Sequence, residues 1–259
     1  MRRKLILTIL SLVLVASLVV VSGQTLAQEK KKEPPKQYMP VLSYRTGAFQ
    51  AGGSGLSGGY EDYMNLVNIK GGLLGGVMLD WEECEFGYNT ARGIECYERV
   101  KSKNPIVIHP MGTGVAYALL ERATKDRIPL LTLGYGRSDA TDGTVIPYVF
   151  PLITNYWSQN SAKIRYIAQR AGGIDKLKGL KIANLHLDHP YGRETRFILE
   201  IMAENFGFIV QHFPVPWPGI DQRSIWLMIR RFKPDWVINR NWGVSCTVPL
   251  KEAARVGYP

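Results

Sequence analysis

Hydrophobic residues follow two alternating patterns along the chain, and the clearest example lies in its middle. Ile106–Ile108 and Ile128–Leu133 are short apolar runs of the kind that forms strands buried on both faces. Between them, apolar residues recur at helical spacing from Val115 to Ala123. Lys125 and Arg127 follow where cations suit the negative end of a helix dipole. This stretch therefore predicts one strand–helix–strand unit.

The turns of this unit are rich in small residues and predict a ligand site. In a parallel strand–helix–strand unit both strands end on the same edge of the sheet, where open α/β sheets bind their ligands. This edge carries His109–Gly114 and Gly134–Arg137, and Thr113 stands at the expected N-cap of the helix. Small residues with free N–H groups at a helix N-terminus can hold a carboxylate. The alternative is that these glycines only form tight turns, but two such loops on one edge favour a ligand site.

Strands and helices alternate in the same way on both sides of the central unit. Before it, the pattern predicts strands at Tyr38–Tyr44 and Val77–Trp81 and helices at Tyr60–Ile69 and Tyr88–Lys103. After it, helices and strands are expected in turn at Trp157–Arg170, Lys181–Leu187, Tyr191–Asn205, Phe208–Phe213, Ile220–Phe232, Trp236–Asn239 and Thr247–Val256. The alternation predicts an α/β fold with a doubly wound parallel sheet and a second series of the same kind.

The segment Asp139–Phe150 interrupts this rhythm. Pro147 and Pro151 bracket a short extended stretch, and prolines fix such a stretch as stiff and non-helical. We therefore expect a hinge crossing at 147–153. It divides a first ligand-binding lobe, 38–146, from a second one, 154–259.

The N-terminus has the pattern of a secretory signal peptide. Three cations in Met1–Lys4 precede the apolar run Leu5–Val21, and Thr25–Ala27 offers small residues before Gln28. We expect residues 1–27 to be removed on export. The apolar run is long for a signal, so an uncleaved membrane anchor is the alternative. Residues 28–37, rich in lysine and proline, are predicted to form a solvated linker.

Composition narrows the classes of function. The chain has 259 residues, of which 46% are hydrophobic, so it can bury a sizeable core. Its formal charge of +10 comes partly from the N-terminal segments, and no basic block lies inside the predicted fold. The charge is therefore interpreted as favouring solubility rather than nucleic-acid binding.

The three cysteines leave two interpretations open. An exported chain meets conditions under which disulfides persist. Cys84 and Cys96 are twelve residues apart, across a strand end and a helix, and are close enough in sequence to pair, with Cys246 free. Three buried thiols that pack as small hydrophobic groups are equally compatible with the sequence.

One motif suggests an enzyme. Gly53–Gly58 fits G-x-G-x-x-G after a strand, with Asp80 at the end of the next strand, as in dinucleotide-binding enzymes. The loop from Tyr44 to Gly53 is too long for the tight turn that the motif needs, and an exported chain meets little free nicotinamide cofactor. We therefore interpret Gly47–Gly59 as a glycine-rich ligand loop.

Other candidate chemistry is weaker. The four histidines show no metal-ligand spacing, and no serine stands in a nucleophile-elbow context. Glu82, Glu83 and Glu85 are interpreted as a solvated acidic turn. The sequence therefore predicts no catalytic residue, no metal and no cofactor.

From about Met39 to its end, the chain resembles the periplasmic substrate-binding proteins of ATP-driven (ABC) importers, of the branched-chain amino acid type. The resemblance rests on the order and spacing of short motifs: Gly71-Gly72, the acidic turn, His109–Gly114, Ile128–Thr132, Pro147–Phe150, Asp188–Gly192 and Lys251–Gly257. It implies a type I periplasmic binding protein fold, in which two doubly wound parallel-sheet lobes close on a small polar solute. An amino acid, an amide or a related carboxylate would suit. The implied protein is a periplasmic monomer without enzymatic activity, and its partners are the membrane permease subunits.

The resemblance also implies the ligand-binding residues. In amino-acid-binding members, a hydroxyl residue matching Thr113 and nearby backbone hold the ligand carboxylate. A neighbouring loop takes the amino group, and two aromatic side chains cover the ligand from the second lobe. The matching positions are Gly112, Thr113, Gly134, Tyr135, Gly136, Tyr191 and Trp242. At Gly136 this sequence lacks the threonine that amino-acid binders use.

The family continues well beyond the position of Pro259. We therefore expect the second lobe and the hinge to be incomplete, which predicts weak binding by the chain as given. The alternatives are a secreted or membrane-anchored ligand-sensing domain and, less favoured, a dinucleotide-dependent enzyme that uses Gly53–Gly58.

Overall fold

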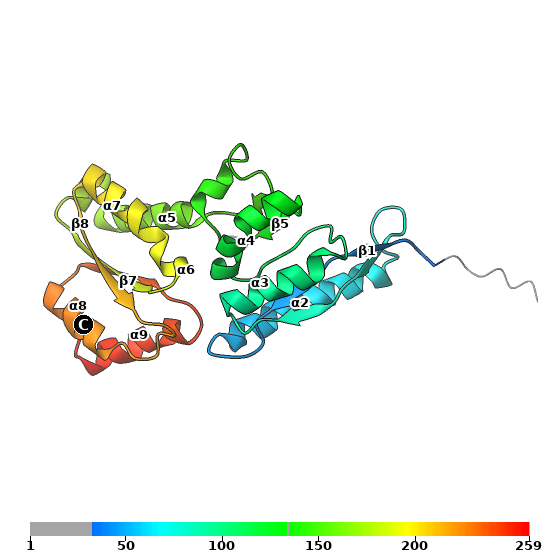
Figure 1. The fold of residues 1–259 in the computed structure, drawn as a ribbon. Coiled ribbons are helices and arrows are strands. Elements are labelled where there is room, and N and C mark those ends of the chain that lie inside the picture. Colours follow the sequence, from blue (N-terminus) through cyan, green and yellow to red (C-terminus); the bar gives the residue numbers. More distant parts are fainter. Residues whose placement is uncertain (1–32, 134, 259) are drawn as a thin grey trace, which may run out of the picture. The chain divides into compact units, whose positions relative to one another are not determined.

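The computed structural model of the protein describes residues 33–133 and 135–258 (Figure 1). The helices and strands described below belong to one compact unit that begins at Lys36. The predicted signal peptide and residues 28–32 of the predicted linker lie outside the described residues. Within the described residues, none of the helices is both long and apolar enough to cross a membrane.

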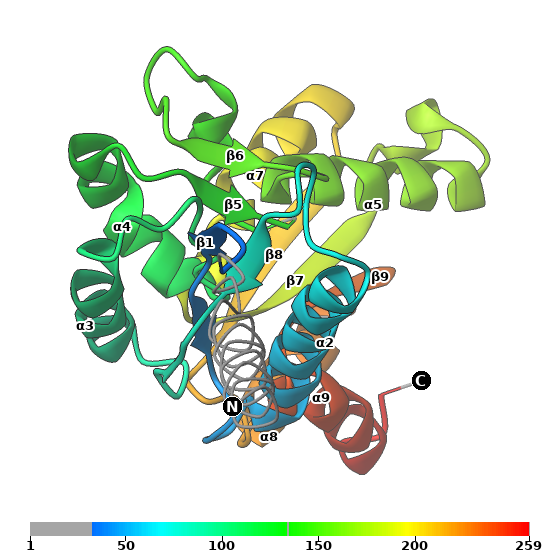
Figure 2. The same cartoon turned by 90° about the vertical axis from the view of Figure 1, so that its right-hand side faces the viewer.

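The first lobe comprises β1 to β6 with helices α2 to α4. Its elements are β1 (Lys36–Tyr38), β2 (Val41–Ser43), α2 (Gln50–Ile69), β3 (Met78–Asp80), β4 (Glu83–Glu85), α3 (Thr90–Lys101), α4 (Thr113–Asp126), β5 (Leu130–Thr132), the short 3-10 helix η1 (Ser138–Thr141) and β6 (Val149–Pro151). The strands pair in parallel as β1–β3, β2–β4 and β5–β6. Single bridges from Val41 to His109 and from Ile108 to Leu130 join these pairs. Helices α3 and α4 cover one face of the strands and α2 the other (Figure 2).

Prolines explain why the strands of this lobe are short. The predicted strand Tyr38–Tyr44 is divided into β1 and β2 at Pro40, which has no N–H for a ladder hydrogen bond. The predicted strand Ile106–Ile108 is reduced to the two single bridges. It ends before Pro110, and Met111 then takes a positive φ of 41° that turns the chain into α4.

The predicted glycine-rich loop Gly47–Gly59 is wrong in most of its length, because helix α2 begins at Gln50. Glycine is a poor helix former, but Gly53 and Ser57 are buried on the face that packs against β2. A Cβ atom at Gly53 would lie 1.9 Å from the Tyr44 carbonyl oxygen, so glycine is needed there. Because Gly53–Gly58 lies within a helix and not in a strand-to-helix turn, the dinucleotide fingerprint is also wrong.

The interpretation of Glu82, Glu83 and Glu85 as a solvated turn is also wrong. Residues 83–85 form strand β4, which pairs with β2. Glu83 pairs with Arg45, and Arg45 also contacts Glu61 at 2.7 Å, while Glu82 pairs with Lys103. Glu82 and Glu83 therefore meet cations, whereas Glu85 accepts from the Thr46 hydroxyl at 3.1 Å.

The second lobe has a three-stranded parallel sheet with the order β8–β7–β9. Its elements are α5 (Tyr156–Ala171), η2 (Ile174–Leu177), β7 (Lys181–Leu187), α6 (Pro190–Arg193), α7 (Thr195–Phe206), β8 (Ile209–Val215), α8 (Arg223–Phe232), β9 (Trp236–Arg240) and α9 (Val244–Arg255). The bounds predicted for β7 are confirmed. Helices α5 and α7 lie on one side of the sheet and α8 and α9 on the other (Figure 1). The predicted α/β fold with parallel, doubly wound lobes is confirmed.

The chain passes from the first lobe to the second immediately after β6. The predicted crossing 147–153 contains β6, which pairs with β5 in the first lobe. Residues 152–155 then lead into α5, where the Asn155 side chain caps the helix by accepting a hydrogen bond from the Ser158 N–H at 2.9 Å. We therefore place the crossing at 152–155.

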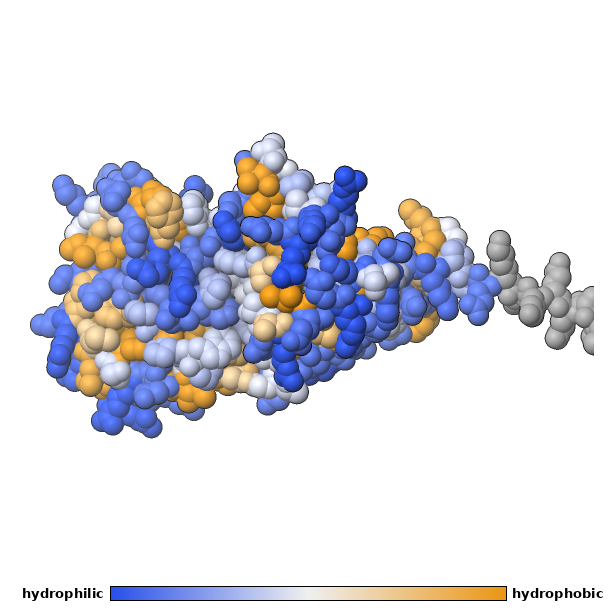
Figure 3. Space-filling view, viewed as in Figure 1, coloured by the Kyte–Doolittle hydropathy of each residue, from blue (hydrophilic) through white to orange (hydrophobic). Residues whose placement is uncertain are grey.

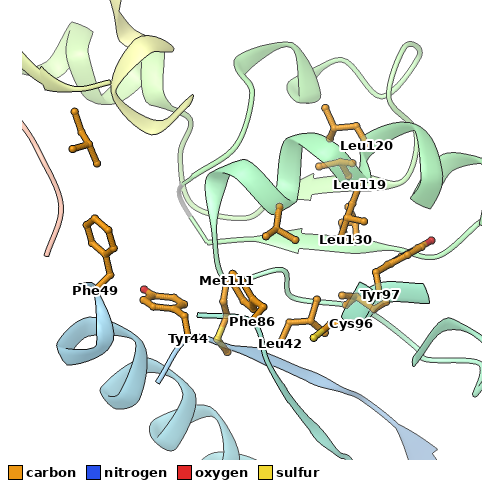
Figure 4. Packing of buried hydrophobic residues seen from close by; sticks show 14 of the residues in the cluster. Leu42, Tyr44, Phe49, Phe86, Cys96, Tyr97, Met111, Leu119, Leu120 and Leu130 are labelled. Carbon is orange, nitrogen blue, oxygen red and sulfur yellow. The ribbon is translucent and has the colours of Figure 1, made fainter. Parts of the chain in front are cut away.

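The main hydrophobic core includes residues of both lobes, and the residues labelled in Figure 4 belong to its first-lobe part. Leu42, Phe86 and Leu130 are fully buried in it, and Met111 is 2% exposed. A disulfide joins Cys84 on β4 to Cys96 on α3, with the Cα atoms 5.7 Å apart, and Cys246 is free and exposed. The face of the molecule in Figure 3 is mostly hydrophilic, with hydrophobic residues scattered over it.

Candidate functional site

A cavity of about 230 Å³ lies where the carboxyl ends of the strands of both lobes meet. We call it the cleft cavity. Its lining is mainly aromatic and comprises Tyr44, Leu56, Tyr88, Met111, Gly112, Thr113, Leu133, Tyr135, Tyr156, Gln159, Tyr191, Arg240 and Trp242. The loops that follow β2, β4, β5, β7 and β9 all contribute to it. The site therefore stands where ligands of open α/β sheets bind.

A larger hollow of about 850 Å³ surrounds Arg137, Trp157 and Glu194. Its polar groups pair with one another: Arg137 pairs with Asp139, and Glu194 accepts from the Ser138 N–H at 3.0 Å. None of its lining side chains has a buried polar atom without a partner. It is therefore a weaker candidate for a built site than the cleft cavity.

Thr113 lies at the start of α4 but does not cap the helix, so that part of the prediction is wrong. Gly112 takes the N-cap position, with extended backbone and no capping side chain. The Thr113 side chain, 1% exposed, reaches across to the second lobe instead, where its hydroxyl lies 2.5 Å from the Tyr156 hydroxyl. Thr113 therefore links the two lobes at the wall of the cavity.

Four tyrosines contribute to the cavity wall, of which Tyr44 and Tyr156 are buried and Tyr88 and Tyr191 half-buried. The rings of Tyr44 and Tyr88 meet edge to face with centroids 4.7 Å apart, and those of Tyr156 and Tyr191 do so at 5.4 Å. Burial raises the pKa of each of these phenols above its ordinary value. The four hydroxyls therefore stay protonated at neutral pH and bring no negative charge to the cavity.

Arg240 is the one cation among the lining residues that the structure describes. It is the last residue of β9 and is 3% exposed. Its Cζ atom lies 4.2 Å from the ring centre of Tyr156 and 4.0 Å from that of Tyr191, within the range of cation–π attraction. Its Nη1 donates to the Gln159 side chain at 2.9 Å. Its Nε and Nη2 are buried and have no hydrogen-bond partner in the described part of the chain.

Trp242 and Tyr191 cover the cavity from the second lobe. Their ring centres lie 6.3 Å apart, and the Tyr191 hydroxyl donates to the Asn241 carbonyl at 3.2 Å. Trp242 is 39% exposed and lies against α2, where a Cβ atom at Gly52 would be 3.3 Å from its ring. The absence of a side chain at Gly52 therefore leaves room for the Trp242 indole.

The structure brings most of the predicted site residues together. Five of the seven line the cleft cavity: Gly112, Thr113, Tyr135, Tyr191 and Trp242. Gly136, at φ +115°, is not in the lining, but its backbone contacts the Tyr156 phenol. Gly134 lies outside the described residues. No three His, Cys, Asp or Glu side chains are grouped to hold a metal ion within residues 33–133 and 135–258.

Met111 belongs to the predicted ligand loop His109–Gly114 but was not named as a site residue. Sequence reasoning also did not name seven other lining residues: Tyr44, Leu56, Tyr88, Leu133, Tyr156, Gln159 and Arg240. Arg240 ends a strand, so the rule that identified Thr113, proximity to the carboxyl edge of the sheet, applies to it as well. Tyr156 and Gln159 belong to the first turn of α5 and reach the cavity only through the packing of one lobe on the other.

Comparison with known proteins gives one family. The family described as periplasmic binding protein matches residues 36–259. No curated protein sequence matches the chain.

Several solved structures are similar to the chain. An ABC transporter protein from the Pseudomonas fluorescens group, described as a permease, is 48% identical with a TM-score of 0.75. The match covers 87% of this chain and 55% of that one. A branched-chain amino acid ABC transporter protein from Thermus thermophilus with bound valine is 21% identical, with a TM-score of 0.76 and coverages of 86% and 57%. A solute-binding protein from Rhodopseudomonas palustris in complex with benzoate is 19% identical, with a TM-score of 0.70 and coverages of 86% and 60%. The chain thus spans little more than half the length of these proteins.

Proposed function

The chain belongs to the periplasmic binding protein family, and on that basis we propose that it is the solute-binding component of an ATP-driven importer. It captures a small polar solute in the cleft cavity and delivers it to membrane permease subunits. The protein is a monomer without enzymatic activity and without a cofactor. It works in the periplasm after export through the signal sequence at residues 1–27.

The observation that carries this proposal is the cleft cavity itself. It is lined from both lobes, mostly by residues that follow strand ends, and its polar groups lie among aromatic rings. Small-molecule sites have this composition, with a mainly apolar wall and a few placed polar groups. A solute held by both lobes favours the closed arrangement, because closure brings the second set of contacts to it.

The similar structures support a small solute with a polar head. The one from Thermus thermophilus holds valine and the one from Rhodopseudomonas palustris holds benzoate. Both molecules carry a carboxylate on an apolar body. We assign the polar head to Gly112, Thr113 and the loop from Gly134 to Gly136, and we assign Tyr191 and Trp242 to the cover over the solute.

A thermal-shift screen of the purified protein tests this function. Amino acids, amides and short carboxylates are added one at a time, and at least one should raise the melting temperature, because a ligand that binds only the folded state stabilises it by mass action. The effect should be lost in Thr113→Val and kept in Thr124→Val. Thr124 is a matched control on the same helix, where its hydroxyl bonds the Leu120 carbonyl at 2.9 Å. No stabilisation by any solute in the panel would contradict the proposal.

A further inference from the structure

We propose that Arg240 anchors the solute and that this solute is a carboxylate with an apolar body and no ammonium group. The proposal rests on the proposed function and specifies the solute class that the cleft cavity takes. Its basis is a buried guanidinium with two donors that have no partner among the described residues, in a cavity whose described lining has no acidic side chain.

The charge of the cavity is unbalanced. None of its described lining residues is Asp or Glu, and its five tyrosines are protonated, because burial raises the pKa of each phenol. An arginine keeps its charge in proteins, and a buried charge without a partner is costly. The rings of Tyr156 and Tyr191 and the Gln159 side chain compensate part of this cost. An anion in the cavity would supply the missing partner.

The geometry of the free donors selects the type of anion. Nε and Nη2 lie on the same edge of the guanidinium group, the edge that pairs with both oxygens of a carboxylate. Gln159 holds the remaining nitrogen, Nη1, so the group is fixed in orientation before a solute arrives. The Tyr135 hydroxyl is also buried; it lies beside the Met111 backbone, has no acceptor among the described residues and offers one more donor in the same cavity.

The rest of the lining selects the body of the solute. Leu56, Met111 and Leu133 are apolar, and the tyrosine and tryptophan rings present flat apolar faces. An ammonium group would meet the positive Arg240 and find no carboxylate in this lining. The cavity therefore discriminates against zwitterionic amino acids and favours simple carboxylates, an exclusion by charge rather than by size.

Calorimetric titration of the unaltered protein tests the solute class directly. Butyrate, cyclohexanecarboxylate and benzoate are each compared with their own primary amide, and L-valine is included as a zwitterion. We expect at least one carboxylate to bind about tenfold or more tightly than its amide, because bonds to charged groups are the stronger ones. We expect L-valine to bind weakly or not at all.

Substitution of Arg240 tests the anchor. Arg240→Gln should weaken the carboxylate about tenfold or more and leave its amide nearly unchanged. Arg240→Lys keeps the charge but loses the paired donors of the guanidinium group. Its affinity for the carboxylate should therefore lie between those of the unaltered protein and Arg240→Gln. Arg231→Gln, at an exposed position on α8, is the matched control and should bind as the unaltered protein does. Circular dichroism checks that each variant is folded. If Arg240→Gln does not fold, the comparison of carboxylates with their amides in the unaltered protein decides whether the solute is a carboxylate.

The outcomes separate this inference from the proposed function. Equal binding of carboxylate and amide, preference for L-valine, or unchanged carboxylate affinity in Arg240→Gln would overturn the inference and leave a solute-binding protein. Binding of no solute from any class would overturn the proposed function as well.

Discussion

The hydroxyls of Thr113 and Tyr156 lie 2.5 Å apart and join the first turn of α4 in the first lobe to the first turn of α5 in the second. Both side chains are nearly fully buried, at 1% and 2% exposed. A buried hydrogen bond that loses one partner leaves the other unsatisfied, which costs about 1–3 kcal/mol. The pair therefore couples the packing of the lobes to the wall of the cleft cavity.

This coupling can be measured by a double-mutant cycle on the free energy of unfolding. Thr113→Val and Tyr156→Phe should each destabilise the protein by about 1 kcal/mol. The double variant should lose less than the sum, because the bond can be broken only once. Chemical denaturation of the four proteins gives the values. Strict additivity would show that the two hydroxyls do not interact in solution.

The disulfide between Cys84 and Cys96 should be detectable by thiol counting. The denatured but unreduced protein should show one reactive thiol, that of Cys246, which is exposed. Reduction should then lower stability by on the order of 3 kcal/mol, because the bond closes a short loop in the unfolded chain. Three reactive thiols before reduction would refute the bond.

Stability should depend on pH through His109. This side chain is buried between the rings of Tyr60 and Tyr135, whose centres lie 5.6 and 5.8 Å from its own, and both ring nitrogens lack a partner among the described residues. Burial lowers the pKa of His109 from its ordinary 6.5 to about 4. The unfolded state therefore binds a proton below pH 6.5 that the folded state refuses until about pH 4. Above pH 6.5 His109 therefore does not lower the free energy of unfolding. As the pH drops towards 4, the free energy of unfolding falls by on the order of 3 kcal/mol because of this group.

His109→Phe isolates this effect, because it keeps a stacked ring and removes the titration. Burial also lowers the pKa of the three other histidines, which share the acidic window: His186, His189 and His212. The stability of the unaltered protein relative to the variant should therefore fall by on the order of 3 kcal/mol as the pH drops from 6.5 to 4. Parallel pH profiles of the two proteins would contradict the assignment to His109.

Trp217 should hold the lobes together outside the cavity. Its ring lies 4.5 Å from that of Phe49 and 5.8 Å from that of Tyr88, both in the first lobe, and 4.8 Å from that of His189 in the second. Aromatic pairs contribute about 0.5–1.5 kcal/mol each beyond the area they bury. Trp217→Ala should therefore let the lobes separate more often and speed proteolysis at residues 152–155.

Tyr166→Ala is the control for this experiment, because Tyr166 packs on Trp236 within the second lobe. Limited proteolysis followed by mass spectrometry locates the cut. Equal cleavage rates at 152–155 in the two variants would show that Trp217 does not restrain the lobes.

The sequence predicted those parts of the fold that local patterns determine. Strand β7 was predicted with its bounds, because Lys181–Leu187 is a continuous run of residues buried on both faces. The start of helix α2 was not predicted, because its first two turns consist largely of glycine and serine. Glycine is needed at position 53 because of contact with Tyr44, a residue outside the helix. Propensity predicts a loop there, and tertiary packing determines a helix.

The candidate site also contains some residues that local patterns predict and others that they do not. Thr113 and Trp242 were identified because both follow strand ends, where topology places ligands. Arg240 also ends a strand, but an arginine at the end of a strand is usually solvated, and only the structure shows it 3% exposed between two tyrosines. The position of Tyr156 in the cavity depends on how the lobes pack, which local sequence patterns do not predict.

The central claim is that one solute is held by both lobes in the cleft cavity. Calorimetric titration of the solute found by screening into Thr113→Val and Trp242→Leu tests it most directly, because one change lies in each lobe. The account predicts a single site per chain and an affinity about tenfold or more lower in each variant. Unchanged affinity in either variant would contradict it, because the solute would then be bound without one of the two lobes.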